Sequence, residues 1–265
     1  MNKRYIHKGL IDSTSSEIGR LALEGAPEGI IVTADAQTAG KGRRGRSWEA
    51  EAGTSLLFSL LLRPNLVPDA APRITLLMAM AVTKAIREMA GLKAQIKWPN
   101  DVVVNAKKVC GILTEMQVKN GAIDYVVVGT GVNVNQTSIP AELENSATSL
   151  LLEKEKLLTD NMGNLAESSE NGFDCNVLLE RILDAFEDYY ELFLQKPNLS
   201  DFKAEYNSWL VSLDKEVKVL DPKGEFIGIS KGINENGELL VALPNGEVTA
   251  IYAGEVSVRG LYGYV

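Results

Sequence analysis

A short basic loop between two apolar segments is the feature that most restricts how this chain can fold. Residues 40–48 read GKGRRGRSW, with three glycines and four cations in the first seven positions. The flanking residues 29–37 and 53–62 have the apolar composition of buried strands. The run is therefore expected to connect two core strands, which argues against a solvated basic patch of the nuclear-localisation type. Its glycines allow close backbone approach and its cations offer donors to oxyanions, so the sequence predicts an anion-binding loop.

Composition limits the classes of function. The chain has 265 residues, 45% of them hydrophobic, which suits one large domain and a smaller one. A net charge of −8 argues against a broad nucleic-acid-binding face, and the apolar runs are too short to span a bilayer. Two cysteines, Cys110 and Cys175, without a signal-peptide pattern predict a cytoplasmic location. The single histidine, His7, excludes histidine metal clusters and argues against a Ser-His-Asp triad.

Two helices are expected around the predicted strands. Thr14 and Glu17 have the spacing of a capping box, which predicts a helix that follows a short N-terminal lead and ends by residue 25. Residues 69–90 carry apolar side chains at helical spacing, with Pro72 in the first turn and Gly91 as the stop.

Residues 95–135 predict an antiparallel meander. A Pro-Asn-Asp turn aims Asn100 and Asp101 at the edge of the following strand. An Asn-Gly pair then predicts a hairpin between the two longest strands of the meander. Because side chains alternate along a strand, either Lys107 or Lys108 should face inward.

The C-terminal part predicts helices followed by short strands. Residues 153–172 are polar and read as a short charged helix and a loose loop, and residues 176–194 have the apolar face of an amphipathic helix. A shorter helix is expected at 200–210. Five short strands between residues 216 and 259 then predict a small SH3-like barrel that packs on the larger domain.

Several motifs, taken in order, resemble those of one known family, the biotin–protein ligases, also called biotin–acetyl-CoA-carboxylase ligases. They are DST at 12–14, Gln37 followed by the loop at 40–48, KWPND at 97–101, Lys108 leading into GIL at 111–113, GTGVNVN at 129–135, ATSL at 147–150 and AGEVS at 253–257. Each motif is weak alone, but the ordered series is specific and spans nearly the whole chain. The resemblance implies an α+β fold: a class II synthetase-like catalytic domain at 1–213, with helices packed on a mixed, largely antiparallel sheet, and an SH3-like β-barrel at 214–265.

The activity implied by this resemblance is a two-step ligation. Biotin reacts with ATP, with Mg²⁺ present, to give biotinyl-5′-adenylate and pyrophosphate. A lysine of a biotin carboxyl carrier protein domain of acetyl-CoA carboxylase, or of a related carboxylase, then takes the biotinyl group. Joining a carboxylate to a triphosphate brings two anions together, and the cations of residues 41–46 with Lys108 suit that task.

The resemblance also implies roles for individual residues, with Lys108 and Arg43 catalytic. Lys108 is chosen over Lys107 by its spacing from KWPND. The implied biotin-binding residues are Ser13, Thr14, Ser15, Gln37, Gly40, Lys41, Gly42, Arg43, Lys108 and Gly111. The implied nucleotide-binding residues are Arg43, Arg44, Arg46, Trp48, Asn100, Asp101, Asn133 and Arg259. Glu255, together with Arg259, is expected to bring the small domain toward the nucleotide, and no metal-ligating residues are identified.

Two positions depart from the family pattern. Ser15 stands where the family has Asn, and Lys41 stands where it has Arg. A serine offers one hydroxyl in place of an amide, and a lysine lacks the planar guanidinium fork, so the contacts at both positions are expected to differ.

Two other functions remain open at this stage. A lipoate- or octanoate-protein ligase of the same superfamily shares the adenylation chemistry, although the basic loop and KWPND fit the biotin branch better. The second is a non-catalytic binding module built on the SH3-like tail. Because the catalytic motifs begin by Asp12, an N-terminal helix-turn-helix repressor domain is not expected, nor is nucleic acid or membrane binding. The strand near residues 125–134 offers a route to a homodimer by edge-to-edge pairing.

Overall fold

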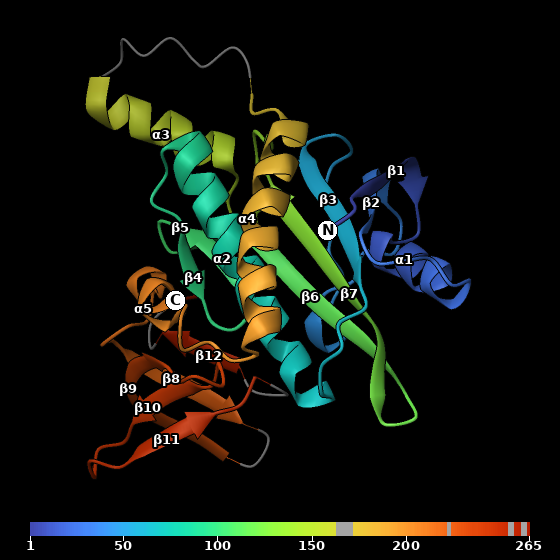
Figure 1. Ribbon diagram of the computed structural model, residues 1–265. Coiled ribbons are helices and arrows are strands. Elements are labelled where there is room, and N and C mark those ends of the chain that lie inside the picture. The colour runs from blue at the N-terminus through green and yellow to red at the C-terminus, as the bar shows by residue number, and fades with distance from the viewer. Residues whose placement is uncertain (163–171, 222–223, 254–256, 261–263) are drawn as a thin grey trace.

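The computed structural model describes residues 1–162, 172–221, 224–253, 257–260 and 264–265. A seven-stranded mixed sheet forms the larger part of the molecule and a five-stranded antiparallel sheet forms the C-terminal part (Figure 1). In spatial order the larger sheet contains β1 (Arg4–Ile11), β2 (Ile30–Gln37), β3 (Ser55–Leu62), β7 (Ala122–Asn133), β6 (Lys107–Lys119), β5 (Asp101–Val104) and β4 (Gln95–Lys97). The smaller sheet contains β11 (Val248–Ile251), β10 (Leu239–Ala242), β9 (Gly224–Ile233), β8 (Glu216–Asp221) and β12 (Ser257–Gly260).

Helices cover both faces of the larger sheet. The long helices α2 (Ala71–Ala90) and α4 (Cys175–Gln195) pack side by side across one face, and α1 (Thr14–Leu23) packs on the other against β2, β3 and β7 (Figure 1). Every residue of β3 is buried, since Phe58 and Leu60 enter the core on the face covered by α4 and α2, while Leu61 enters the core under α1. The remaining helices are α3 (Leu150–Met162) and α5 (Lys203–Trp209), with single 3₁₀ turns at Arg43–Gly45 and Pro68–Ala70.

Most predicted elements are confirmed. Helix α2 has Pro72 in its first turn and ends at Gly91, whose φ of 66° is the left-handed value that favours glycine. Asn120 and Gly121, with φ of 53° and 79°, make the predicted hairpin between β6 and β7. Helices α3 and α5 begin at Leu150 and Lys203, a few residues from the predicted starts. The loop predicted near residue 170 lies outside the described residues.

The N-terminal segment is a strand, and predicting it as a lead was wrong. Strand β1 pairs in parallel with β2, from Arg4 opposite Ile30 to Ile11 opposite Gln37. It is an edge strand without a fully buried residue, so it lacks the apolar alternation that marks a half-buried strand. His7 is exposed, as expected of a terminal side chain, and lies 3.0 Å from Thr33 Oγ1.

The capping-box prediction was also wrong. The N-cap of α1 is Ser13, and its side chain makes no capping hydrogen bond. The Thr14 side chain instead bonds to neighbouring strands, and Glu17 pairs with Arg20 and Lys8.

The edge predicted for dimerisation is not an edge. Strand β7 lies between β3 and β6 and is hydrogen-bonded to both. The outer side of β6 is different, because the register with β5 ends at Gly111, and no other described strand pairs with Thr114–Lys119 on that side.

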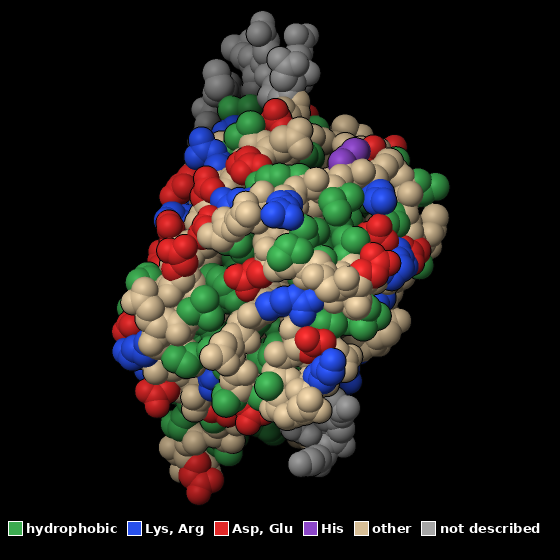
Figure 2. Space-filling model, turned by 45° about the vertical axis from the view of Figure 1, so that its right-hand side comes forward, with side chains coloured by type: hydrophobic (Ala, Val, Ile, Leu, Met, Phe, Trp, Pro, Cys, Tyr) green, Lys and Arg blue, Asp and Glu red, His purple; other side chains and the backbone are tan. Residues whose placement is uncertain are grey.

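The C-terminal sheet is attached to the larger part by specific contacts. Arg73 of α2 donates to the Asn236 carbonyl at 3.1 Å, and the Trp98 indole donates to the Gly237 carbonyl at 3.0 Å. Among the described helices, none combines the length and apolar character needed to cross a bilayer. Acidic and basic side chains are interspersed over the face drawn in Figure 2.

Candidate functional site

One cavity, partly open to solvent, gathers most of the predicted site residues. It lies beside the start of α1, under the basic loop, over β6 and β7. The lining residues are Ser13, Thr14, Ser15, Gln37, Lys41, Gly42, Arg43, Trp48, Leu57, Asn100, Lys108, Gly111, Ile112, Leu113, Gly129, Thr130 and Gly131.

Hydroxyl groups form one end of this cavity. Thr14 donates from its backbone N and from Oγ1 to Gln37 Oε1, at 2.7 and 3.1 Å. The hydroxyls of Thr14 and Ser15 lie 2.8 and 3.0 Å from Ser59 Oγ, and all three residues are buried. The start of α1 is thereby fixed to β2 and β3, and this end suits a neutral polar group with both donors and acceptors.

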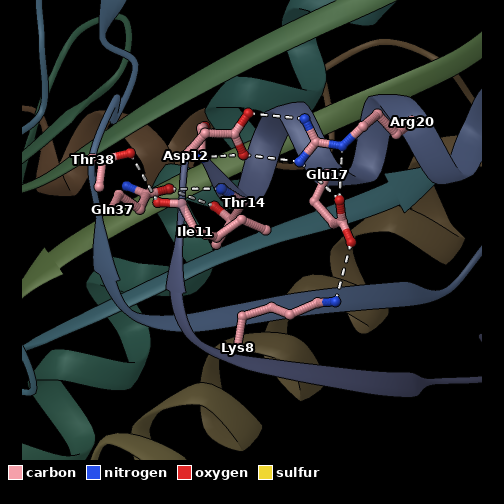
Figure 3. Close-up of polar contacts among 9 residues, drawn as sticks. Lys8, Ile11, Asp12, Thr14, Glu17, Arg20, Gln37 and Thr38 are labelled. Carbon is pink, nitrogen blue, oxygen red and sulfur yellow. Dashed lines mark hydrogen bonds and ion pairs between the residues drawn. The ribbon is translucent and has the colours of Figure 1, made fainter.

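An ion-pair cluster holds the turn before α1 (Figure 3). Arg20 donates to both carboxylate oxygens of Asp12 at 2.8 Å and to Glu17 Oε2 at 2.8 Å, while Lys8 pairs with Glu17 from β1. The Asp12 carboxylate also accepts from the Ser13 backbone N–H at 2.7 Å. The Arg20 hydrogen bonds, aided by this backbone bond, hold the pKa of Asp12 well below its ordinary value. The bidentate pair therefore orients the segment that carries Ser13 and Thr14.

Glycines form the floor of the cavity. Gly111 of β6 and Gly131 of β7 lie opposite each other in the strand register. A Cβ at Gly131 would lie 2.6 Å from Trp48 Cε2, and one at Gly111 would lie 2.8 Å from Trp48 Cζ3 and 2.9 Å from Lys108 Nζ. A Cβ at Gly129 would overlap Ser15 Oγ. Only glycine at these positions lets the Trp48 ring and the α1 hydroxyls approach the sheet this closely.

The basic loop is a small closed turn. Gly42 N–H donates to the Arg46 carbonyl at 2.7 Å, and Trp48 N–H donates to the Gly40 carbonyl at 2.9 Å. Arg44 has a left-handed φ of 60°. Arg44 and Arg46 are exposed, whereas the Trp48 indole N–H is buried without a hydrogen-bond partner among the described residues. The loop thus covers the cavity with Trp48 and leaves an indole donor available at its inner surface.

The two meander lysines point in opposite directions, as predicted. Lys108 lines the cavity, and its Nζ lies 2.7 Å from Asp101 Oδ1 and 5.3 Å from the Trp48 ring centroid. Lys107 is on the outside and donates to the Glu144 carbonyl at 2.6 Å.

Arg43 connects the loop to both parts of the molecule. Its guanidinium donates to Asn100 Oδ1 and to the Ala253 carbonyl, each at 2.7 Å. Burial lowers the pKa of the Arg43 side chain, and the neighbouring Asp101 carboxylate opposes that effect. The guanidinium nonetheless remains a cation at neutral pH.

Some predicted residues do not line this cavity. Arg44 and Arg46 face outward, and Gly40 and Asp101 lie just behind the lining residues. Asn133 is buried, donating to the Thr148 carbonyl and accepting from Gln136. Arg259 belongs to β12, but its side chain lies outside the described residues, as does Glu255.

Other lining residues were not predicted as site residues. They are Leu57, Ile112, Leu113, Gly129, Thr130 and Gly131. The spacing of Gly129 and Gly131, one residue apart and hence on one face of a strand, is the sequence signal that could have identified the floor. Ser59, which orients two hydroxyls, carries no such signal.

A second, roomier cavity adjoins the first and shares Arg43, Asn100, Ile112 and Leu113 with it. Its other walls come from the start of α2, the turn between β4 and β5, the outer side of β6 and the C-terminal part, through Pro72, Pro99, Met116 and Tyr252 respectively. In the described part of the chain, no three His, Cys, Asp or Glu side chains gather as a metal cluster would require.

Two family models match the chain. The model described as "Biotin/lipoate A/B protein ligase family" matches residues 10–133, and "Biotin protein ligase C terminal domain" matches residues 212–259. A curated relative named Bifunctional ligase/repressor BirA, from Bacillus spizizenii, is 34% identical over 97% of this chain and 75% of its own length. The Biotin--[acetyl-CoA-carboxylase] ligase of Paracoccus denitrificans is 31% identical over 94% of this chain and 98% of its own length.

The fold is also similar to that of solved structures. The biotin protein ligase from Aquifex aeolicus, in complex with biotin and ATP, superposes with a TM-score of 0.77 at 30% identity, covering 98% of this chain and 100% of that one.

Proposed function

We propose roles for the residues of this cavity on the premise that the chain belongs to the biotin–protein ligase family. Its two domain matches, and relatives that match nearly the whole of this chain, assign it to that family. The chain is an ATP-dependent ligase that activates biotin and transfers it to a protein lysine. The observation that carries the proposal is a single cavity with hydroxyl donors at one end and two cations, Lys108 and Arg43, near the other.

In the first step, a biotin carboxylate oxygen attacks the α-phosphorus of ATP and pyrophosphate leaves. Thr14, Ser15 and Gln37 are proposed to bind the ureido ring, because their hydroxyl and amide groups can both donate and accept. The carboxylate then reaches the region of Lys108 and Arg43, whose charges offset the repulsion between the two anions. The ion pair with Asp101 keeps Lys108 Nζ at the cavity wall.

The nucleotide is proposed to lie on the side of the cavity formed by the loop and the Asn100 turn. Trp48 offers an aromatic face and an indole donor there, and the exposed Arg44 and Arg46 are also proposed to contact the nucleotide. Asn133 and Arg259 are kept as proposed nucleotide contacts, and binding through Asn133 would require its present hydrogen bonds to be exchanged. Mg²⁺ is proposed to arrive on the ATP phosphates, since Mg²⁺ commonly uses few protein ligands beside substrate oxygens.

In the second step, the uncharged amine of an acceptor lysine attacks the carbonyl carbon of the adenylate. The bond to the AMP oxygen breaks, AMP leaves, and the amide nitrogen loses a proton. We propose that the acceptor is a biotin carboxyl carrier protein domain of a carboxylase. The second cavity supports this assignment, because it adjoins the first cavity and reaches Arg43.

Three further assignments accompany this proposal. The catalytic domain is assigned to residues 1–213 and the SH3-like domain to 214–265. A homodimer is proposed to use the outer edge of β6 in place of β7. A cytoplasmic location is supported by Cys110 and Cys175, which are both free thiols.

The test is exchange of labelled pyrophosphate into ATP, which isolates the first step and needs no acceptor. Rapid exchange with biotin and none with lipoate is expected. Exchange with lipoate but not biotin would favour a lipoate–protein ligase, the alternative that the first family model's description includes. Absence of exchange with either acid would refute the proposed chemistry.

The basic loop should become protected when substrates bind. Trypsin is expected to cleave at residues 43–46 readily in the free protein, because Arg44 and Arg46 are exposed, and more slowly with biotin and ATP together. Either ligand alone is the control. Identical cleavage rates under all conditions would show that the loop does not order over the adenylate.

A further inference from the structure

The C-terminal end of the described chain reaches the ion pair that holds Lys108. The Tyr264 hydroxyl donates to Asp101 Oδ2 at 2.5 Å, while the other oxygen of the same carboxylate, Oδ1, lies 2.7 Å from Lys108 Nζ. The Asp101 carboxylate therefore accepts a hydrogen bond from Tyr264 on one oxygen and forms an ion pair with Lys108 through the other. Nothing in the sequence pattern pointed to Tyr264, because it lies 163 positions from Asp101.

The Tyr264 ring makes a separate contact with Lys97. Lys97 Nζ lies 3.2 Å from the centre of the Tyr264 ring, within the range of a cation–π contact. Lys97 ends β4, and Asp101 begins the paired strand β5 opposite it. The ring and the hydroxyl thus fix Tyr264 at two points on the same hairpin.

The C-terminal part makes a second contact with the site. The Ala253 carbonyl accepts from Arg43, whose guanidinium also donates to Asn100 Oδ1. Asn100 in turn donates to Asp101 Oδ1 at 3.1 Å. The two proposed cations, Lys108 and Arg43, are thereby both connected to the C-terminal part through one turn.

We propose that Tyr264 is a positioning residue for the adenylation step: its hydroxyl orients the Asp101 carboxylate, which in turn aims Lys108 Nζ into the cavity. A carboxylate held on both oxygens has one orientation, whereas a carboxylate held through Oδ1 alone, here by Lys108 and Asn100, can rotate and carry the flexible lysine with it. This inference rests on the proposed function and adds a residue of the C-terminal part to its machinery.

The decisive variant is Tyr264→Phe in the full chain, because it removes the hydroxyl and leaves the ring over Lys97. Loss of a hydrogen bond to a charged group should lower kcat for biotin-dependent pyrophosphate exchange by about fivefold to tenfold. The KM for biotin should change by less than about twofold, since Tyr264 does not line the cavity. Tyr5→Phe is the matched control, because Tyr5 also donates to a carboxylate, Glu180 Oε2, at 3.0 Å but on a distant surface.

A double-mutant cycle separates positioning from a general structural effect. In an Asp101→Asn background, Tyr264→Phe should have little further effect, because its influence passes through the carboxylate. The inference is overturned if Tyr264→Phe exchanges at the wild-type rate, if Tyr5→Phe loses as much activity, or if the loss persists in full beside Asp101→Asn. The exchange rate of the wild-type protein is the reference in each case. If the wild-type protein itself shows no exchange, the proposed function is contradicted, and not the role of Tyr264 alone.

Discussion

Replacement of Lys108 by alanine is expected to lower biotin-dependent pyrophosphate exchange by at least about a hundredfold, or roughly 2.7 kcal/mol of transition-state stabilisation. Lys108 is the cation of β6 that faces the cavity, and its removal would leave the biotin carboxylate and the α-phosphate with one fewer charge between them. The measurement is the initial rate of exchange at saturating biotin and ATP.

Lys107→Ala is the matched control for this experiment. The two lysines are neighbours in sequence, but Lys107 Nζ is bonded to the Glu144 carbonyl on the outer surface. The Lys107→Ala variant should keep an exchange rate within about twofold of the wild-type rate, because substitutions on the surface away from a site have small effects. If the Lys108→Ala variant exchanges pyrophosphate at the wild-type rate, the catalytic role belongs to another cation, and Arg43 is the first to examine.

Periodicity in the sequence predicts those elements whose burial is strongly one-sided or complete. Helices α2 and α4 and the strands β8–β12 have clear apolar patterns and terminating turns, and all were predicted within a few residues. Strand β1 escaped prediction because an exposed edge strand needs only backbone pairing with its neighbour, which leaves no periodic trace in RYIHKGLI.

The site residues that the sequence predicts are likewise those that belong to local patterns. The loop and Lys108 belong to local motifs with unusual composition, so sequence comparison finds them. The contacts that complete the site depend on strand register and on chain segments far apart. Pairing between β6 and β7 sets Gly111 opposite Gly131, and the Ala253 carbonyl reaches Arg43 across 210 positions.

Local rules also failed where a tertiary contact was stronger. Thr14 and Glu17 have the spacing of a capping box. In the structure, however, Gln37 Oε1 accepts hydrogen bonds from the backbone N–H and the hydroxyl of Thr14, and the Glu17 carboxylate accepts from Arg20. The start of α1 is thus fixed by strands and ion pairs, and this leaves the hydroxyl groups of Thr14 and Ser15 at the cavity wall.

The glycine floor leads to the second large expected effect. Gly129→Ala should raise the KM for biotin by about thirtyfold, or about 2 kcal/mol, which is the middle of the range of about 1–3 kcal/mol that overpacking a rigid site typically costs. The new methyl group would overlap Ser15 Oγ, which cannot move without breaking its 3.0 Å contact with Ser59 Oγ. The KM is measured by pyrophosphate exchange over a range of biotin concentrations.

A second substitution identifies the cause of that loss. Ser15→Ala removes the overlapping oxygen, so the double variant Ser15→Ala/Gly129→Ala should bind biotin better than Gly129→Ala alone, although Ser15→Ala by itself loses a proposed biotin contact. Gly19→Ala in α1 is the matched control, since a Cβ there would meet no atom within 4 Å. If the free-energy losses of Ser15→Ala and Gly129→Ala, calculated from the KM for biotin, simply add in the double variant, then Gly129→Ala weakens biotin binding by a route other than Ser15.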